Sequence, residues 1–232
     1  MATETGSIWK SIEVIKGYIL NHCPSVKLIG FEVIPGLVHV LRAGADQGIL
    51  GSKGFMYDKD HHFWAQGEPA GFLGIINATP LPAISNLVDT LGLLAVPTNG
   101  WGGPNPDLQF AYTGDTNDVN LLSNLSTLDS LAQNLTVLGI NVLFFITPES
   151  PYYKDLGYFG RYGPDMTTGY WIVNHFAGLS QKNPLIYLYD AHKAGYHDYR
   201  DDDATDQDHL SENGAQKFST RVDSLVHAII DK

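Results

Sequence analysis

The feature that most constrains the fold of this chain is an alternation of amphipathic helices with short apolar strands over residues 127–230. Four leucines recur at three- and four-residue spacing and predict the first helix; they are Leu128, Leu131, Leu135 and Leu138. Gly139 is well placed to end that helix, because glycine readily takes the left-handed conformation found after helix C-termini. The further elements expected are a strand at 140–146, a helix at about 165–180, a strand at 185–189 and a helix at about 211–230.

The start of the chain shows the same order of helix and strand once more. Isoleucines at helical spacing predict a helix over 8–20, and the β-branched run 26–34, closed by Pro35 and Gly36, predicts a buried strand. Apolar strands that alternate with amphipathic helices imply a mostly parallel sheet covered on both faces. We therefore expect the α/β class, with a three-layer α/β/α arrangement around a mostly parallel sheet.

A long irregular region separates these two parts at about 35–120 and is rich in Gly, Pro, Asn and aromatic residues. Structureless loops of such length are uncommon inside compact domains, so this region should contain short elements of its own or act as a lid. A chain of 232 residues fits one domain. We expect a single domain over 1–232 that carries this region as an insertion.

Charge and composition narrow the classes of partner. The formal net charge is −11, and the 14 Lys and Arg residues are scattered rather than gathered on one basic segment. This pattern disfavours nucleic acid and anionic membrane surfaces as partners, and no apolar run is long enough to predict a membrane span. Residues 1–7 lack the basic and apolar regions of a signal peptide. The single cysteine, Cys23, is expected to be a buried structural thiol.

The most informative segment for chemistry is Asp206-Gln-Asp-His209, which precedes the last predicted helix. A general-base histidine needs a partner that fixes its tautomer and stabilises its positive charge. An aspartate three residues earlier, on a turn that enters a helix, can place its carboxylate beside Nδ1 and leave Nε2 facing a nucleophile. Two other interpretations remain open: an exposed acidic loop, and a calcium site whose spacing does not match an EF-hand. The acidic residues in question are Asp201, Asp202, Asp203, Asp206 and Asp208.

This segment, followed by Leu210 and Gly214-Ala215, resembles the last sequence block of the SGNH/GDSL hydrolase family. The resemblance implies an SGNH/flavodoxin-like fold in which Asp206 and His209 complete a Ser-His-Asp triad. Residues 54–64, 145–153 and 160–164 are similar to a branch of this family found in modular proteins of fibre-degrading bacteria.

The resemblance also implies a substrate cleft lined by parts of these segments. The candidates are Tyr57, Asp58, His61, Trp64, Ser150 and Tyr152. The aromatic members of this set have an alternative role, which is to pack the long insertion.

The chain departs from the family pattern at its start. The family carries its nucleophile in a Gly-Asp-Ser block after the first strand, and neither that block nor an equivalent strand is found in this sequence. Gly6 matches the second block, whose glycine supplies an amide to the oxyanion hole. Ser7 is then the nucleophile candidate, at a helix N-terminus that favours a developing anion, although a simple N-cap is its alternative role. A missing first strand would expose a sheet edge through which the chain could form homo-oligomers.

These observations favour an ester hydrolase of the carboxylesterase or carbohydrate deacetylase type, acting on a small-molecule or carbohydrate ester. We expect no metal and no cofactor. One alternative is a glycoside hydrolase that uses two carboxylates, for which the candidates are Asp58, Asp60, Glu149, Asp206 and Asp208. Another alternative is a truncated, non-catalytic hydrolase domain that binds polysaccharide.

Overall fold

The structure is a computed structural model. The residues that it describes are 12, 15–39, 55–57, 63–65 and 98–231. The chain divides into two compact units, one formed by residues 1–26 and 40–94 and the other by residues 27–39 and 95–232. Each unit is described by itself, and a single domain over 1–232 stays a prediction. None of the helices in the described part of the chain is long and apolar enough to cross a membrane.

The first unit contains a short helical segment and a small hairpin. The π-helix η1 (Ile15–Ile19) continues into the helix α2 (Leu20–His22), and β2 (Phe55–Tyr57) pairs antiparallel with β3 (Phe63–Ala65). The helix predicted over 8–20 is therefore described only in part, and its described portion is helical. Cys23 is half-buried, so the expectation of a buried thiol is wrong in degree, and the thiol is free of a disulfide.

The second unit is built on a parallel sheet of three strands. Its order is β1 (Leu28–Glu32), β4 (Asn141–Ile146), β5 (Ile186–Asp190). The register places Phe31 beside Phe144, and Phe144 beside Leu188, with all strands parallel. Continuous apolar sequence in β4 matches its place in the middle of the sheet, where both of its faces can be covered.

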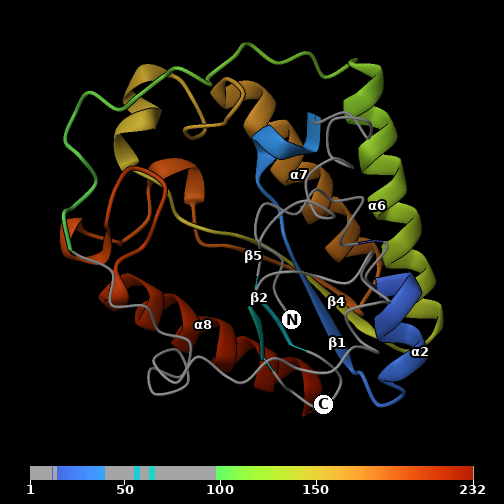
Figure 1. Cartoon of the computed structure of the whole chain (residues 1–232). Coiled ribbons are helices and arrows are strands. Elements are labelled where there is room, and N and C mark those ends of the chain that lie inside the picture. The colour runs from blue at the N-terminus through green and yellow to red at the C-terminus, as the bar shows by residue number, and fades with distance from the viewer. Residues whose placement is uncertain (1–11, 13–14, 40–54, 58–62, 66–97, 232) are drawn as a thin grey trace. The chain divides into compact units, whose positions relative to one another are not determined.

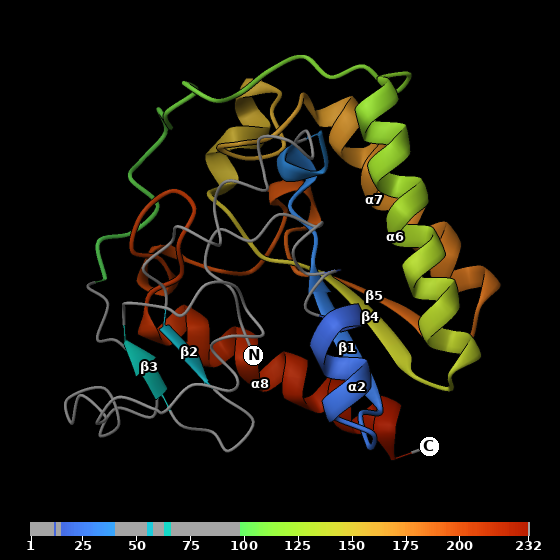
Figure 2. The ribbon, with the colours of Figure 1, turned by 45° about the vertical axis from the view of Figure 1, so that its right-hand side comes forward.

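Helices lie on both faces of this sheet. Figures 1 and 2 show α6 (Val119–Val137) and α7 (Met166–Lys182) side by side on one face, and α8 (Glu212–Ile230) on the other. Adjacent residues of β4 point to opposite faces, because side chains alternate along a strand. Accordingly the ring of Phe144 packs 4.6 Å from that of Phe176 on α7, and Phe145 packs 6.0 Å from Phe218 on α8. The α/β class predicted from the sequence is confirmed.

Side-chain caps set where the three long helices begin. Asp118, Asp165 and Ser211 accept backbone N–H groups of the first turns of α6, α7 and α8. Such caps are worth about 1 kcal/mol each. The cap at Asp118 explains why α6 begins well before the leucine stripe that predicted it. At the other end Gly139 has a φ of 75°, as expected for the residue that follows a helix C-terminus.

The segments that follow the strands gather at one edge of the sheet, because the strands are parallel. They contain short 3₁₀ turns: η2 (Pro35–His39) after β1, η3 (Pro151–Leu156) after β4, and η4 (Lys193–Gly195) and η5 (Asp201–Asp203) after β5. In open α/β sheets, ligands and reactive groups are found beyond the carboxyl ends of the strands. The residues described next lie in these segments.

Candidate active site

Residues 206–209 form a turn that backbone pairing closes at its base. Ala204 and Leu210 form an antiparallel bridge, and the N–H of Thr205 donates to the carbonyl of His209 at 2.9 Å. One residue further out, the N–H of Ser211 donates to the carbonyl of Asp203, also at 2.9 Å. The turn therefore leads directly into α8, which Ser211 caps.

Glycine at position 214 is required by this arrangement. A Cβ there would collide with the carbonyl of Asp203, which is the backbone group that closes the turn. The partly buried side chain of Leu210 packs against a buried aromatic cluster that includes Trp101 and Tyr199. The Leu210 and Gly214 pattern of the sequence thus has a packing reason that is independent of any resemblance.

Asp206 organises the turn and binds the imidazole of His209. Its Oδ1 accepts the backbone N–H groups of Asp208 at 3.0 Å and His209 at 2.9 Å. The ring Nδ1 of His209 lies 2.9 Å from Oδ1 and 3.0 Å from Oδ2 of Asp206. Because an ionised carboxylate only accepts hydrogen bonds, Nδ1 carries the proton in the neutral ring, and Nε2 presents a lone pair.

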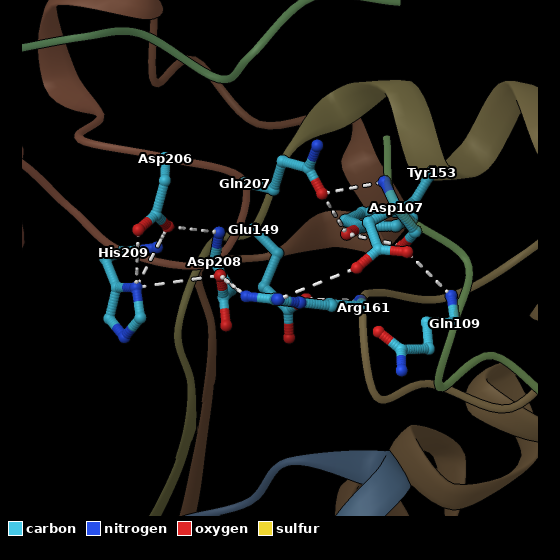
Figure 3. A network of polar contacts seen from close by, with 9 residues as sticks. All are labelled: Asp107, Gln109, Glu149, Tyr153, Arg161, Asp206, Gln207, Asp208 and His209. Carbon is cyan, nitrogen blue, oxygen red and sulfur yellow. Dashed lines mark hydrogen bonds and ion pairs between the residues drawn. The ribbon is translucent and has the colours of Figure 1, made fainter. Parts of the chain in front are cut away.

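The imidazole is open on its other side. The side chain of His209 is 67% exposed, and Figure 3 shows Nε2 turned away from both neighbouring carboxylates. The spacing argument predicted this pairing with Asp206, and the structure has it.

The carboxyls of Asp206 and Asp208 have opposite pKa shifts. Desolvation opposes ionisation of Asp206, but the N–H of Asp208 and the ring of His209 outweigh it and lower the pKa of Asp206. Desolvation raises the pKa of Asp208, and a hydrogen bond shared with Asp206 raises it further. The carboxyl that binds the imidazole is therefore the one that stays ionised more readily.

Gln207 fastens the turn to the segments that follow β4 and that precede α6. Its Oε1 accepts the N–H of Asp107 at 2.8 Å and the hydroxyl of Tyr153 at 3.0 Å. Its backbone carbonyl accepts the N–H of Ser150 at 2.8 Å. The turn is thus held to the carboxyl end of the sheet by three hydrogen bonds to residues distant in sequence.

Arg161 makes a second connection from the segment between η3 and α7. Its guanidinium donates to Oδ1 of Asp208 at 3.0 Å and lies 3.6 Å from a carboxylate oxygen of Asp107. Its backbone N–H donates to Oε2 of Glu149 at 2.8 Å. Figure 3 shows these groups in one network with the His209 ring.

Glu149 is only partly exposed, and its carboxyl is desolvated. Desolvation raises the pKa of Glu149 to about 8, although the hydrogen bond from the Arg161 backbone opposes it; the charges of Asp208 and Glu32 raise the pKa further. A Cβ at position 160 would collide with the Glu149 carboxylate, so Gly160 lets the chain approach it. Glu149 is mainly protonated at neutral pH and fixes the Arg161 backbone.

Two candidate cleft residues have structural roles in this unit. Ser150 is fully buried, and its hydroxyl caps η3 by accepting the N–H of Tyr152 at 3.4 Å. Such burial fits a cap rather than a surface of an open cleft. Tyr152 is half-buried against the cluster that contains Trp101.

The remaining candidates belong to the sequence ranges of the first unit. Tyr57 and Trp64 belong to the strands β2 and β3 of the first unit. Five lie outside the described residues: Gly6, Ser7, Asp58, Asp60 and His61.

The sequence interpretation missed Arg161, Gln207 and Asp107. Arg161 stands in the Gly160–Pro164 segment that the resemblance singled out, but nothing in that segment indicated its partner. In the sequence Asp208 is one acid among several, and nothing near it indicates Arg161 as its partner. The sequence gives little indication of the contacts of Arg161 and Gln207, because each joins residues that are far apart in the chain.

Asp206, Asp208 and His209 form the only group among the described residues that has the composition of a metal site. One atom each of Asp206, Asp208 and His209 lie within 4.8 Å of one another. Arg161 already binds Asp208, and His209 already binds Asp206. The chemistry that this geometry favours is proton transfer at the free Nε2 of an oriented imidazole.

Comparison of the chain with protein-family models, with curated proteins and with solved structures gives no match.

Proposed function

We propose that this protein is a serine-type ester hydrolase in which Asp206 and His209 form the general-base pair. The observation that carries the proposal is the double contact of the Asp206 carboxylate with Nδ1 of a ring whose side chain is 67% exposed. A carboxylate so placed selects the tautomer with a free Nε2 and stabilises the imidazolium that forms during the reaction.

The reaction follows from that tautomer. Nε2 of His209 takes the proton of an attacking hydroxyl as the acyl–oxygen bond forms, and then gives it to the departing alcohol. Asp206 stays ionised throughout and holds the ring. We propose Ser7 as the hydroxyl donor and the Gly6 amide as an oxyanion donor, on the basis of the SGNH/GDSL resemblance. Free water would then cleave the acyl-enzyme with the same base.

The finer fold that we propose is the three-layer SGNH arrangement without the family's first strand. Its support is the parallel order β1-β4-β5 with helices on both faces, and a base that follows the last strand and precedes the last helix. Substrate class and oligomerisation through the sheet edge remain expectations from the sequence.

The test is hydrolysis of p-nitrophenyl acetate by the full chain and by His209→Ala. We expect turnover by the wild type and a loss of about 10²–10⁴-fold in kcat, the usual contribution of a general base. His227→Ala is the matched control, because His227 is also exposed and lies near two carboxylates, on α8. Unchanged turnover by His209→Ala would refute the assignment.

A second measurement identifies the nucleophile and separates the alternatives. A fluorophosphonate probe followed by mass spectrometry should label Ser7, and Ser7→Ala should abolish the label. Nitrophenyl glycosides are assayed in parallel, since turnover of these alone would favour paired carboxylates. Polysaccharide binding without turnover of either substrate would favour the non-catalytic domain.

A further inference from the structure

We infer that Arg161 is a positioning residue that keeps Asp208 away from His209, so that the imidazole is held by Asp206 alone. This inference rests on the proposed function of the same site and assigns a role to a residue that does not touch substrate. Its basis is that two carboxylates, not one, lie within reach of the same ring nitrogen.

The two carboxylates differ in their distance to that nitrogen. Nδ1 of His209 lies 2.9 Å from Asp206 and 3.6 Å from Oδ1 of Asp208. The same Oδ1 accepts the guanidinium N–H of Arg161 at 3.0 Å. Arg161 and His209 therefore compete for one oxygen atom, and the shorter, charge-assisted contact belongs to Arg161.

Arg161 is held so that it can do this without rearrangement. Its backbone N–H is fixed by Glu149 at 2.8 Å, and a second carboxylate, that of Asp107, faces the guanidinium at 3.6 Å. The guanidinium carbon also lies 5.9 Å from the ring centroid of Phe110 and 5.5 Å from that of Tyr162. These contacts hold the backbone and the guanidinium of Arg161 in addition to its hydrogen bond with Asp208.

The expected consequence of losing this cation follows from the burial of Asp208. Its side chain is only 10% exposed, so a carboxylate left without Arg161 has little water to replace it. It would turn to the nearest donors, which belong to the turn of Asp206 and His209. The ring would then be shared between two acids, and Nε2 would lose its fixed direction.

The experiment is a double-mutant cycle with Arg161→Met and Asp208→Asn. We expect Arg161→Met to lower kcat on p-nitrophenyl acetate about ten-fold with KM little changed, as for a displaced catalytic group. Arg161→Lys should retain part of the activity. The double variant should regain most of it, because the competing charge is gone. A structural role for Arg161 alone predicts a double variant no better than Arg161→Met.

A second readout does not depend on activity. The Nδ1 proton of His209, assigned by its absence in His209→Gln, should shift in the proton NMR spectrum of Arg161→Met and return in the double variant. Arg221→Met is the matched control, because Arg221 binds Asp198 outside this network, and it should change neither kcat nor that signal. An Arg161→Met spectrum and kcat like those of the wild type, or a double variant that recovers neither, would overturn the inference. If the wild type lacks turnover, the proposed function is refuted, but the NMR measurement still tests the positioning role of Arg161.

Discussion

Two regions after β5 contain histidines that differ in their exposure to solvent. In the 206–209 turn the side chain of His209 is 67% exposed and bound by a carboxylate. His192, which follows the end of β5, is 2% exposed and stacks on Phe159 with ring centroids 4.3 Å apart. The first ring is exposed beside its carboxylate, whereas the second is part of the apolar core.

The difference shows that the environment of each ring, rather than residue type, decides which histidine can do chemistry. Burial, followed by the nearby His197, lowers the pKa of His192 to about 3. Neither ring nitrogen of His192 makes a hydrogen bond of good geometry among the described residues, although the backbone of Phe159 lies near enough to favour the charged form slightly. His192 is therefore a neutral packing group. His197 stands between the two cases, since its Nε2 lies 2.7 Å from the carbonyl of Glu149.

The largest effect that would sharpen this comparison is expected for Asp206→Asn. The amide can donate as well as accept, so it no longer enforces the tautomer with a free Nε2. We expect kcat on p-nitrophenyl acetate to fall by about 10³–10⁴-fold, as when the aspartate of a triad is changed in this way. Thermal unfolding should change little because Asn still caps the turn. Asp231→Asn, next to the exposed His227, serves as control, and an Asp206→Asn enzyme of normal kcat would remove the contrast between the two regions.

The next prediction concerns the buried ring. A histidine with a folded-state pKa of about 3 stays neutral while the unfolded chain, with its ordinary value of 6.5, takes up a proton. Stability is thus complete above pH 6.5 and is lost as the pH falls from there toward 3. Linkage predicts that the wild type loses about 2 kcal/mol of unfolding free energy at pH 5 from this group.

His192→Phe should remove that loss, because phenylalanine keeps the stacking on Phe159 and does not titrate. Urea denaturation at pH 7 and pH 5 measures the difference for each protein. His227→Gln, at an exposed histidine, is the control for the replacement of a histidine side chain. Equal pH dependence in wild type and His192→Phe would show that His192 is not sealed from solvent as the structure has it.

The fold of the second unit was largely predictable because its signals are local. Helical periodicity and continuous apolar runs located α7, α8, β4 and β5 within a few residues, and a capping glycine located the C-terminal end of α6. The start of α6 was missed because its cap, Asp118, precedes the leucine stripe. The irregular segment before it has no periodicity to follow, so its contacts with residues after β4 and β5 could not be inferred.

The site was predictable only where its partners are close in sequence. Asp206 and His209 are three residues apart, and a turn is sufficient to join them. Arg161 and Asp208 are 47 residues apart, and Tyr153 and Gln207 are 54 apart. Such pairs depend on how parallel strands bring their following segments to one edge, which spacing alone does not specify.

A third prediction tests whether the desolvated carboxyl of Glu149 keeps its proton in the folded chain near neutral pH. Desolvation raises its folded-state pKa to about 8 from an ordinary 4.5. Between these values the unfolded chain has lost the proton and the folded chain keeps it, so wild-type stability falls as the pH rises. Glu149→Gln cannot ionise and still accepts the N–H of Arg161. We expect it to gain about 2 kcal/mol over wild type between pH 5 and pH 6.5 in urea denaturation. A constant difference across this range would mean that Glu149 is ionised throughout.

The smallest effect is expected for Arg221. Like Arg161 it binds an aspartate, but we expect its loss to change the protein much less. It binds both carboxylate oxygens of Asp198 at 2.7 and 2.6 Å, and this hydrogen bonding holds the pKa of Asp198 well below its usual range. However, the two side chains are 37% and 58% exposed, so water and salt screen the pair. We expect Arg221→Met to cost about 0.5 kcal/mol at low salt, less in 0.5 M NaCl, by urea denaturation.

The contribution of this pair is present above the ordinary carboxyl pKa and is lost as the pH falls toward the lowered value. Arg161, by contrast, faces a carboxylate that is 10% exposed, where a missing cation cannot be replaced by water. The same substitution should therefore have different effects at the two arginines. We expect Arg161→Met to change kcat and Arg221→Met to cause only a small change in stability. If Arg221→Met lowered the free energy of unfolding by several kcal/mol, solvent exposure would not explain the difference between the Arg221–Asp198 and Arg161–Asp208 pairs.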